Sequence, residues 1–162
     1  MAVDPAVSRE HLRQELVFLN ELAAACAWDV AADLERLLVV VKMQAHTGDR
    51  FIVEARCDDY REVPAFFEFI DPGSGERGTR RAYPKTTDSF FHDSGPCICA
   101  PFNRKAYKSV VATGPHTDWT FGDWQTSTAN GVPWTNYSTL AGMYGLIHAR
   151  ISRPQYYRGR MA

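Results

Sequence analysis

The spacing of apolar residues changes period twice along this chain, and these changes constrain its fold class more than any other feature. In residues 8–26, apolar side chains recur every three or four positions, which is typical of one face of a helix. Ser8 is predicted to cap this helix, because its hydroxyl can accept a hydrogen bond from a free amide of the first turn. The apolar stripe consists of Leu12, Leu16, Leu19, Leu22 and Cys26, with Arg9, Arg13, Glu15 and Glu21 expected on the other sides.

After this helix the pattern becomes that of strands. Three short apolar runs, at 37–43, 51–56 and 64–70, are each closed by turn residues. Parallel strands need long crossover connections, so strands joined by short turns are expected to run antiparallel. A second helical stripe covers 140–151 and ends before Pro154. We therefore predict an α+β fold in which an N-terminal helix lies on an antiparallel β-meander of three or four strands, followed by a long active-site loop region and a C-terminal helix.

Composition limits the size and the class of the protein. The chain has 162 residues, of which 45% are hydrophobic, enough for a core without disulfides or metal. No repeat or linker divides it, so residues 1–162 are predicted to form a single domain. The net charge of -1, from 18 basic and 19 acidic residues, argues against nucleic-acid binding and against a membrane surface, because both require a basic excess.

The expected compartment follows from the termini and the cysteines. Residues 1–8 lack the features of a signal peptide, and no apolar run approaches the roughly 20 residues that span a bilayer. The four cysteines, Cys26, Cys57, Cys97 and Cys99, match no disulfide framework of small secreted domains. We expect free thiols and a cytoplasmic location, with Cys26 and Cys57 as structural residues.

Several short motifs occur in a characteristic order along the chain. Tyr83-Pro84 follows the meander, then come His92, the segment Gly95-Pro96-Cys97-Ile98-Cys99, Trp134 and the last helix. This order resembles the ubiquitin-conjugating (E2-like, UBC/RWD-type) family, some members of which carry their catalytic cysteine in a Gly-x-Ile-Cys segment. The resemblance implies an E2-like fold and places Cys99 at the catalytic position. It spans roughly residues 8–152.

The chain also departs from the family pattern. Asp93 and Ser94 stand where the family signature has Pro-Asn after the histidine, so the signature amide is missing. The segment between Cys99 and Trp134 is longer than in typical eukaryotic members. These departures resemble divergent bacterial E2-like proteins encoded beside ubiquitin-like, E1-like and JAB-peptidase genes, which raises antiphage defence as a role. The partners implied are a ubiquitin-like protein and an E1-like activating enzyme, with no nucleic acid and no membrane.

The function implied by the resemblance is that of a carrier. Cys99 would accept the C-terminus of the ubiquitin-like protein as a thioester and transfer it to an amine or a hydroxyl. The thiol must become a thiolate to attack, and a nearby cation lowers its pKa. The candidates for this role are His92, Arg104 and Lys105, and Asn103 could donate its amide to an oxyanion.

The alternative is a non-catalytic or metal-binding accessory protein of the same kind of operon. In an extended segment Cys97 points the same way as Cys99, so these thiols together with His92 and His116 could form a tetrahedral zinc site. Cys97 is otherwise a resolving thiol or a structural neighbour. Without metal, no cofactor is expected. A redox protein that uses Cys97 and Cys99 is a third hypothesis.

Aromatic residues gather between the cysteines and the last helix. Either they form a lid over the cysteine segment or they close the core where the sheet ends. The residues concerned are Trp119, Phe121, Trp124 and Trp134.

Overall fold

The computed structural model describes residues 2–121, 124, 128–129, 132–133 and 139–162. Its two helices are α1 (Pro5–Cys26) and α2 (Leu140–Ser152). The strands are β1 (Asp29–Asp33), β2 (Leu38–Gln44), β3 (Arg50–Arg56), β4 (Phe66–Ile70), β5 (Pro84–Thr86), β6 (Phe91–His92), β7 (Cys97–Ile98), β8 (Thr128–Ala129), β9 (Val132–Pro133) and β10 (Tyr157–Arg160). Among the described residues, the 3-10 helices η1 (Arg80–Ala82) and η2 (Arg104–Ala106) interrupt the loops.

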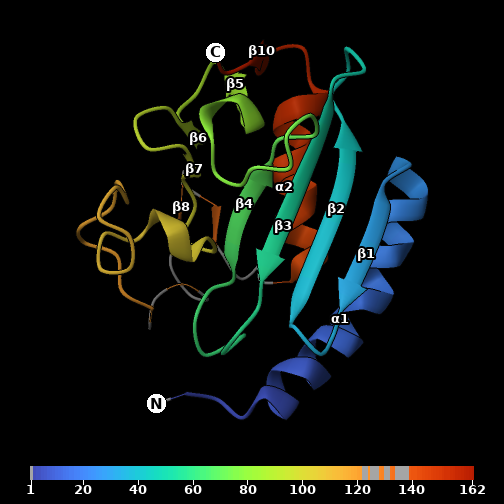
Figure 1. Ribbon diagram of the computed structural model, residues 1–162, viewed down its shortest axis with the longest axis vertical. Coiled ribbons are helices and arrows are strands. Elements are labelled where there is room, and N and C mark those ends of the chain that lie inside the picture. Colours follow the sequence, from blue (N-terminus) through green and yellow to red (C-terminus); the bar gives the residue numbers. More distant parts are fainter. Residues whose placement is uncertain (1, 122–123, 125–127, 130–131, 134–138) are drawn as a thin grey trace.

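The main sheet is a four-stranded antiparallel meander in the order β1-β2-β3-β4 (Figure 1). This confirms the predicted α+β class, the meander and both helices. The strand β1 was not expected, because its sequence lacks an alternating apolar pattern and most of its side chains are exposed. It forms as an edge strand because the turn after it is closed by Asp33, whose carboxylate accepts hydrogen bonds from the amides of Glu35 and Arg36.

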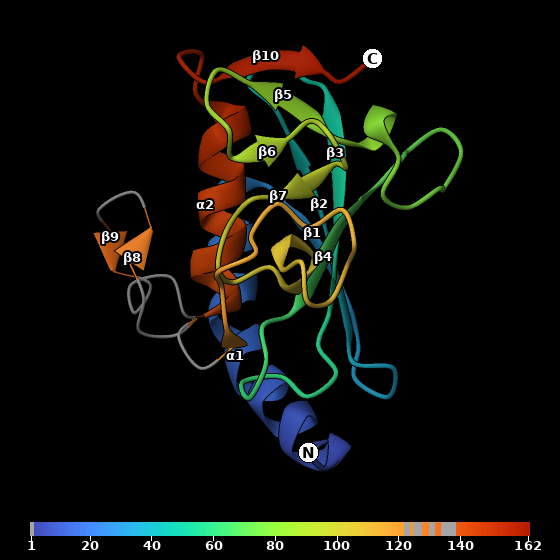
Figure 2. The same cartoon turned by 90° about the vertical axis from the view of Figure 1, so that its left-hand side faces the viewer.

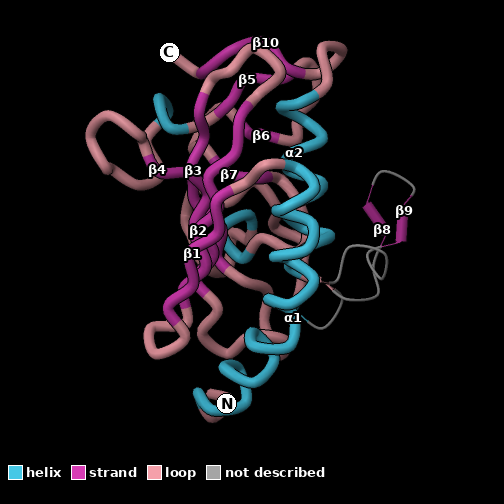
Figure 3. Tube along the Cα trace, turned by 90° about the vertical axis from the view of Figure 1, so that its right-hand side faces the viewer, coloured by secondary structure: helices cyan, strands magenta, loops and turns pink. Residues whose placement is uncertain are grey.

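Both helices cover the same face of this sheet (Figure 3). The covered face presents the alternate residues of the central strands, so Val41 is paired with Val53 and Phe69 is paired with Val53 on the other side, and all three are fully buried. The hydroxyl of Tyr144 on α2 lies 3.0 Å from the carbonyl oxygen of Val39 and anchors the helix to the sheet. One apolar face of a sheet needs only one covering layer, and the two helices supply it together.

Helix α1 begins earlier than expected. Asp4, not Ser8, is its N-cap: the Asp4 carboxylate accepts a hydrogen bond from the amide of Ala6, and Pro5 occupies the first turn. Ser8 is instead fully buried, on the same line as Leu12 and Leu19.

The side of α1 on which Glu15 lies also differs from the expectation. Its side chain is buried and lies 3.0 Å from Arg61, which neutralises it. Ser8 and Glu15 both lie on the face of α1 that is buried against the core. The predicted apolar stripe is therefore rotated around the helix axis relative to this buried face.

The segment after β4 packs against the end of the sheet through small pairs of strands. Tyr83 precedes β5, which pairs with β10, and the hairpin of β6 and β7 lies beside β4 (Figure 2). Aromatic contacts hold this hairpin down: Phe69 of β4 packs edge-on against Phe91, with ring centroids 5.6 Å apart. In the described part of the chain, no helix has the length and apolar character needed to cross a membrane.

Candidate functional site

Cys99 lies immediately after β7, at the tip of a tight turn. The β6–β7 hairpin pairs His92 with Cys97, and the amide of Cys99 donates a 2.7 Å hydrogen bond to the carbonyl oxygen of Phe90. The chain then turns at once, because the amide of Ala100 donates to the carbonyl oxygen of Ile98, two residues back, at 3.0 Å. Cys97 and Ile98 are buried, whereas Cys99 is half-buried. The turn therefore places one thiol of the pair within reach of a substrate.

His116 reaches this thiol from a separate loop. The amide of His116 donates to the carbonyl oxygen of Ala106 at 3.1 Å, and its own carbonyl oxygen accepts from the amide of Lys108 at 2.9 Å. These bonds form a parallel bridge between His116 and Tyr107. The loop approaches closely only because residue 114 is glycine: a Cβ on Gly114 would lie 2.7 Å from the carbonyl carbon of Tyr107.

The side chains of Cys99 and His116 form a hydrogen-bonded pair. The distance between the Cys99 Sγ and the His116 Nε2 is 2.8 Å, although 17 positions separate them in the sequence. A nucleophile and a base within such a distance are the minimum geometry for covalent catalysis by a thiol.

Trp119 fixes the plane of the His116 ring. The indole and the imidazole are stacked, with centroids 3.4 Å apart and planes 3° apart. Trp119 is held in turn by Tyr107, at 5.5 Å between ring centroids. The Tyr107 hydroxyl donates a 2.7 Å hydrogen bond to the carbonyl oxygen of Pro101, two residues after Cys99. Tyr107 thus ties the loop of the base to the turn of the thiol.

Burial sets the protonation of the pair. It raises the pKa of the Cys99 thiol to about 11. Removal from water lowers the pKa of His116; exposed Asp118 opposes this shift and His92 adds to it. Both shifts favour the uncharged forms at neutral pH, and a protonated thiol can donate to an unprotonated Nε2. An uncharged thiol beside an uncharged imidazole differs from a standing thiolate–imidazolium ion pair.

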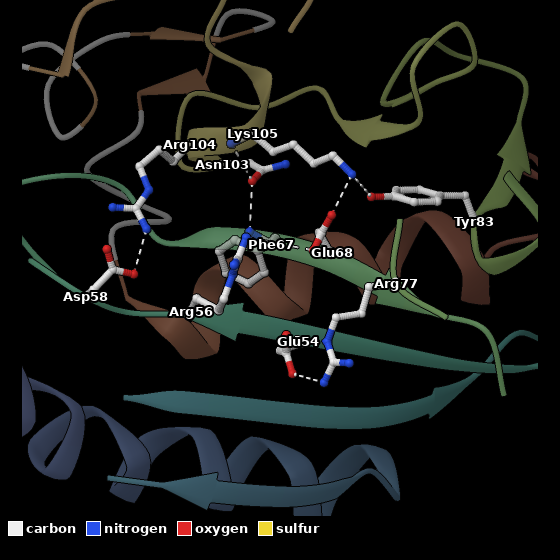
Figure 4. A network of polar contacts seen from close by, with 10 residues as sticks. All are labelled: Glu54, Arg56, Asp58, Phe67, Glu68, Arg77, Tyr83, Asn103, Arg104 and Lys105. Atoms are coloured by element: carbon white, nitrogen blue, oxygen red, sulfur yellow. Dashed lines mark hydrogen bonds and ion pairs between the residues drawn. The ribbon is translucent and has the colours of Figure 1, made fainter. Parts of the chain in front are cut away.

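The two cations considered for lowering the pKa of Cys99 are paired with other residues. Lys105 Nζ lies 2.8 Å from Glu68, and the guanidinium of Arg104 lies 2.8 Å from Asp58 (Figure 4). The charge of Lys105 acts on Cys97, although burial and then the neighbouring Cys99 outweigh it and raise the pKa of Cys97 to about 12.

Asn103 is fully buried and engaged with backbone groups. Its side-chain oxygen accepts from the amide of Phe67 on β4 at 2.9 Å (Figure 4). Its side-chain nitrogen donates to the carbonyl oxygen of Ile98 at 2.9 Å. The same Ile98 carbonyl closes the turn at Cys99. Asn103 therefore connects the sheet to the cysteine turn, and its amide, expected to donate to an oxyanion, is used in this link.

His92 lies on the neighbouring strand, opposite Cys97. Its Nδ1 is buried and has no hydrogen-bond partner among the described residues, and its charge acts on His116. The structure thus groups His92, Cys97, Cys99 and His116 at one end of the sheet, and a hydrogen bond joins the side chains of the last two.

The residues predicted to bind zinc are Cys97, Cys99, His92 and His116. Within the described residues, no group of three or more His, Cys, Asp or Glu side chains is arranged to hold a metal ion. The sulfur and nitrogen ligands of one tetrahedral zinc ion lie about 3.6 Å apart. In this structure Cys99 Sγ and His116 Nε2 are 2.8 Å apart and contact each other directly.

The aromatic residues of the long loop divide between two roles. Trp124 is 2% exposed and belongs to the core, where its ring lies 6.4 Å from that of Tyr60. Trp119 belongs to the site through its stack on His116. Trp134 lies outside the described residues.

Sequence reasoning gave His116 only a metal-binding role and did not assign Trp119 to the histidine. The only sequence feature that indicates the stack is the position of Trp119, three residues after His116. No family model, curated protein or solved structure matches this chain. Its chemistry is therefore inferred from its own side chains.

Proposed function

We propose that this chain is an E2-like carrier in a ubiquitin-like conjugation pathway. Cys99 accepts the C-terminal acyl group of a ubiquitin-like protein from an E1-like activating enzyme and passes it to an acceptor. The observation that carries the proposal is the 2.8 Å contact between Cys99 Sγ and His116 Nε2. It joins a half-buried thiol to a neutral base at the point where the motif resemblance places the nucleophile.

The charging step uses only these two side chains. Cys99 Sγ attacks the thioester carbonyl carbon on the activating enzyme while His116 Nε2 takes its proton. The tetrahedral intermediate then collapses, the bond to the donor sulfur breaks, and His116 returns the proton to that leaving thiolate. One thioester is exchanged for another, so no oxidant and no further energy source is needed in this step.

The order of elements supports an E2-like carrier. The N-terminal helix, the antiparallel meander, Tyr83-Pro84, the cysteine turn and the C-terminal helix follow one another as the resemblance implies. Asp93 stands where the family signature has proline, and it has a structural role here. Its carbonyl oxygen accepts a 2.7 Å hydrogen bond from Arg80. The loop between β6 and β7 is thereby held without the family signature.

A small acyl donor tests the proposal directly. The probe is a short peptide ending in Gly-Gly, supplied as its mercaptoethanesulfonate thioester. Intact mass should show one adduct on Cys99 that a reductant removes, and Cys99→Ser should give no adduct or one that resists reductant. Cys97→Ser is the matched control and should form the adduct as the parent does. If Cys97→Ser abolishes the adduct while Cys99→Ala keeps it, the nucleophile is Cys97 and the proposal is wrong.

A non-catalytic, zinc-holding accessory protein remains the alternative, and elemental analysis separates the two. The carrier is expected to contain less than about a tenth of an equivalent of zinc, because a coordinated thiolate is not available as a nucleophile. A full equivalent of zinc together with unreactive Cys99 would favour the alternative.

A further inference from the structure

Acylation of Cys99 removes the hydrogen bond that the free thiol makes with His116. In the free protein the Nε2 lone pair accepts the thiol proton across 2.8 Å. Once the sulfur carries an acyl group that proton is gone, so Nε2 is left as an unused acceptor beside the thioester. Trp119 covers one face of the imidazole and holds its plane, so the ring remains aimed at the same place.

We propose that His116 acts as the general base for discharge of the thioester and that the acceptor class served by this site is a hydroxyl. This inference rests on the proposed function and names its acceptor. The acceptor oxygen forms a bond to the acyl carbon while its proton moves to Nε2, and the carbon–sulfur bond then breaks. His116 passes the proton to the departing Cys99 sulfur, which restores the free thiol and leaves an oxygen ester on the acceptor.

The choice of a hydroxyl over an amine follows from what a base contributes to each. An unprotonated amine has a lone pair that attacks a thioester unaided and loses its proton later. A hydroxyl attacks poorly unless its proton is removed in the same step, and such assistance contributes about 10²–10⁴-fold. A carrier that served amines alone would gain little from a neutral imidazole fixed 2.8 Å from its sulfur.

The test compares two acceptors on one pre-formed acyl-enzyme. The full chain is charged with the Gly-Gly peptide thioester, freed of donor, and mixed with Nα-acetylserine amide or Nα-acetyllysine amide. Mass spectrometry follows the loss of the adduct and the appearance of the ester or amide. We expect ester formation in the parent, and His116→Gln should slow it by about 100-fold or more while slowing amide formation by less than about fivefold.

Two controls keep the outcome clear. His11→Gln makes the same change on α1 and should leave both rates unchanged, and circular dichroism of His116→Gln verifies that the variant is folded. His116→Ala provides a second variant in which the ring is removed. Equal loss of both rates, or ester formation that does not depend on His116, would overturn the inference while leaving the carrier intact. Failure of the folded parent to form any adduct would overturn the proposed function itself, and the inference with it.

Discussion

Trp119 lies flat on the imidazole of His116, with 3.4 Å between ring centroids and 3° between ring planes. The same histidine contacts Cys99 through its edge. A ring that is stacked on one face and hydrogen-bonded at its edge has little freedom to rotate. Trp119 thus occupies the orienting position that a carboxylate holds in many catalytic triads.

Replacement of Trp119 tests this orienting role. Aromatic pairs contribute about 0.5–1.5 kcal/mol beyond burial, so Trp119→Ala should lower the rate of Cys99 acylation by roughly 10-fold. Trp119→Phe retains a stacking surface and should recover most of the rate. The measurement is the initial rate of adduct formation with the peptide thioester. A loss of rate in Trp119→Phe as large as in Trp119→Ala would show that the stack does not orient His116.

Gly114 sets the approach of the histidine loop to Tyr107. A Cβ at this position would lie 2.7 Å from the Tyr107 carbonyl carbon and oxygen, both of which are backbone atoms. We expect Gly114→Ala to cost about 1–3 kcal/mol of unfolding free energy, as overpacking does, and to separate His116 from Cys99.

Gly145 on α2 provides the matched control. Its added Cβ would meet only the side chain of Leu22, at 3.6 Å. Gly145→Ala should therefore stabilise the protein by up to about 1 kcal/mol, because alanine is the better helix former. Urea unfolding measures both variants, and a stable Gly114→Ala with unchanged acylation would contradict the assigned contact.

The thiols should differ in reactivity and respond steeply to pH. Burial raises the pKa of Cys99 to about 11 and that of Cys97 to about 12, so both thiols are mostly protonated at pH 8. Iodoacetamide attacks the thiolate form. Alkylation of folded protein should therefore rise about tenfold per pH unit from pH 8 to pH 10, with Cys99 modified before Cys97 and Cys57. Peptide mapping after timed quenching gives the order, and modification of buried Cys57 ahead of Cys99 would show that the burial pattern is wrong.

The same shifts predict how stability depends on pH. For an acid whose pKa is higher in the folded state than in the unfolded state, the unfolded state loses its proton first. The folded state then binds more protons, so the free energy of unfolding falls as pH rises above about 9. Urea unfolding at pH 7.5 and at pH 10 should show this loss, and Cys97→Ala should reduce it.

Replacement of Asn103 tests whether its amide positions the cysteine turn or stabilises an oxyanion. Asn103→Ala leaves the buried Phe67 amide and the Ile98 carbonyl without a side-chain partner. The Ile98 carbonyl keeps its bond from the amide of Ala100, whereas an unsatisfied buried amide at Phe67 costs about 1–3 kcal/mol, so we expect lower stability together with slower acylation. Asn20→Ala on the exposed side of α1 should change neither quantity. Slow acylation with unchanged stability in Asn103→Ala would instead assign the amide to the oxyanion.

Much of the scaffold could be predicted from the sequence because the signals are local. Apolar residues at three- or four-residue spacing define α2 to within a residue, and short turns between β-branched runs leave only an antiparallel meander. The edge strand β1 was not predicted, because its side chains are mostly exposed and show no alternation of apolar and polar residues. Its existence depends on hydrogen bonds to β2, which belong to a neighbouring strand and not to the segment itself.

The sequence by itself determined the class of fold and singled out the Cys97–Cys99 segment as the candidate site. Only the tertiary structure decided the chemistry of the Cys99 thiol. His116 meets Cys99 across 17 positions because a glycine lets one loop lie against Tyr107, and Trp119 turns the ring toward the sulfur. Asn103, predicted to donate its amide to an oxyanion, hydrogen-bonds in this structure to the backbone of Phe67 and Ile98. Periodicity reports which face of an element is buried, whereas a contact between two loops depends on side-chain packing that leaves no period in the sequence.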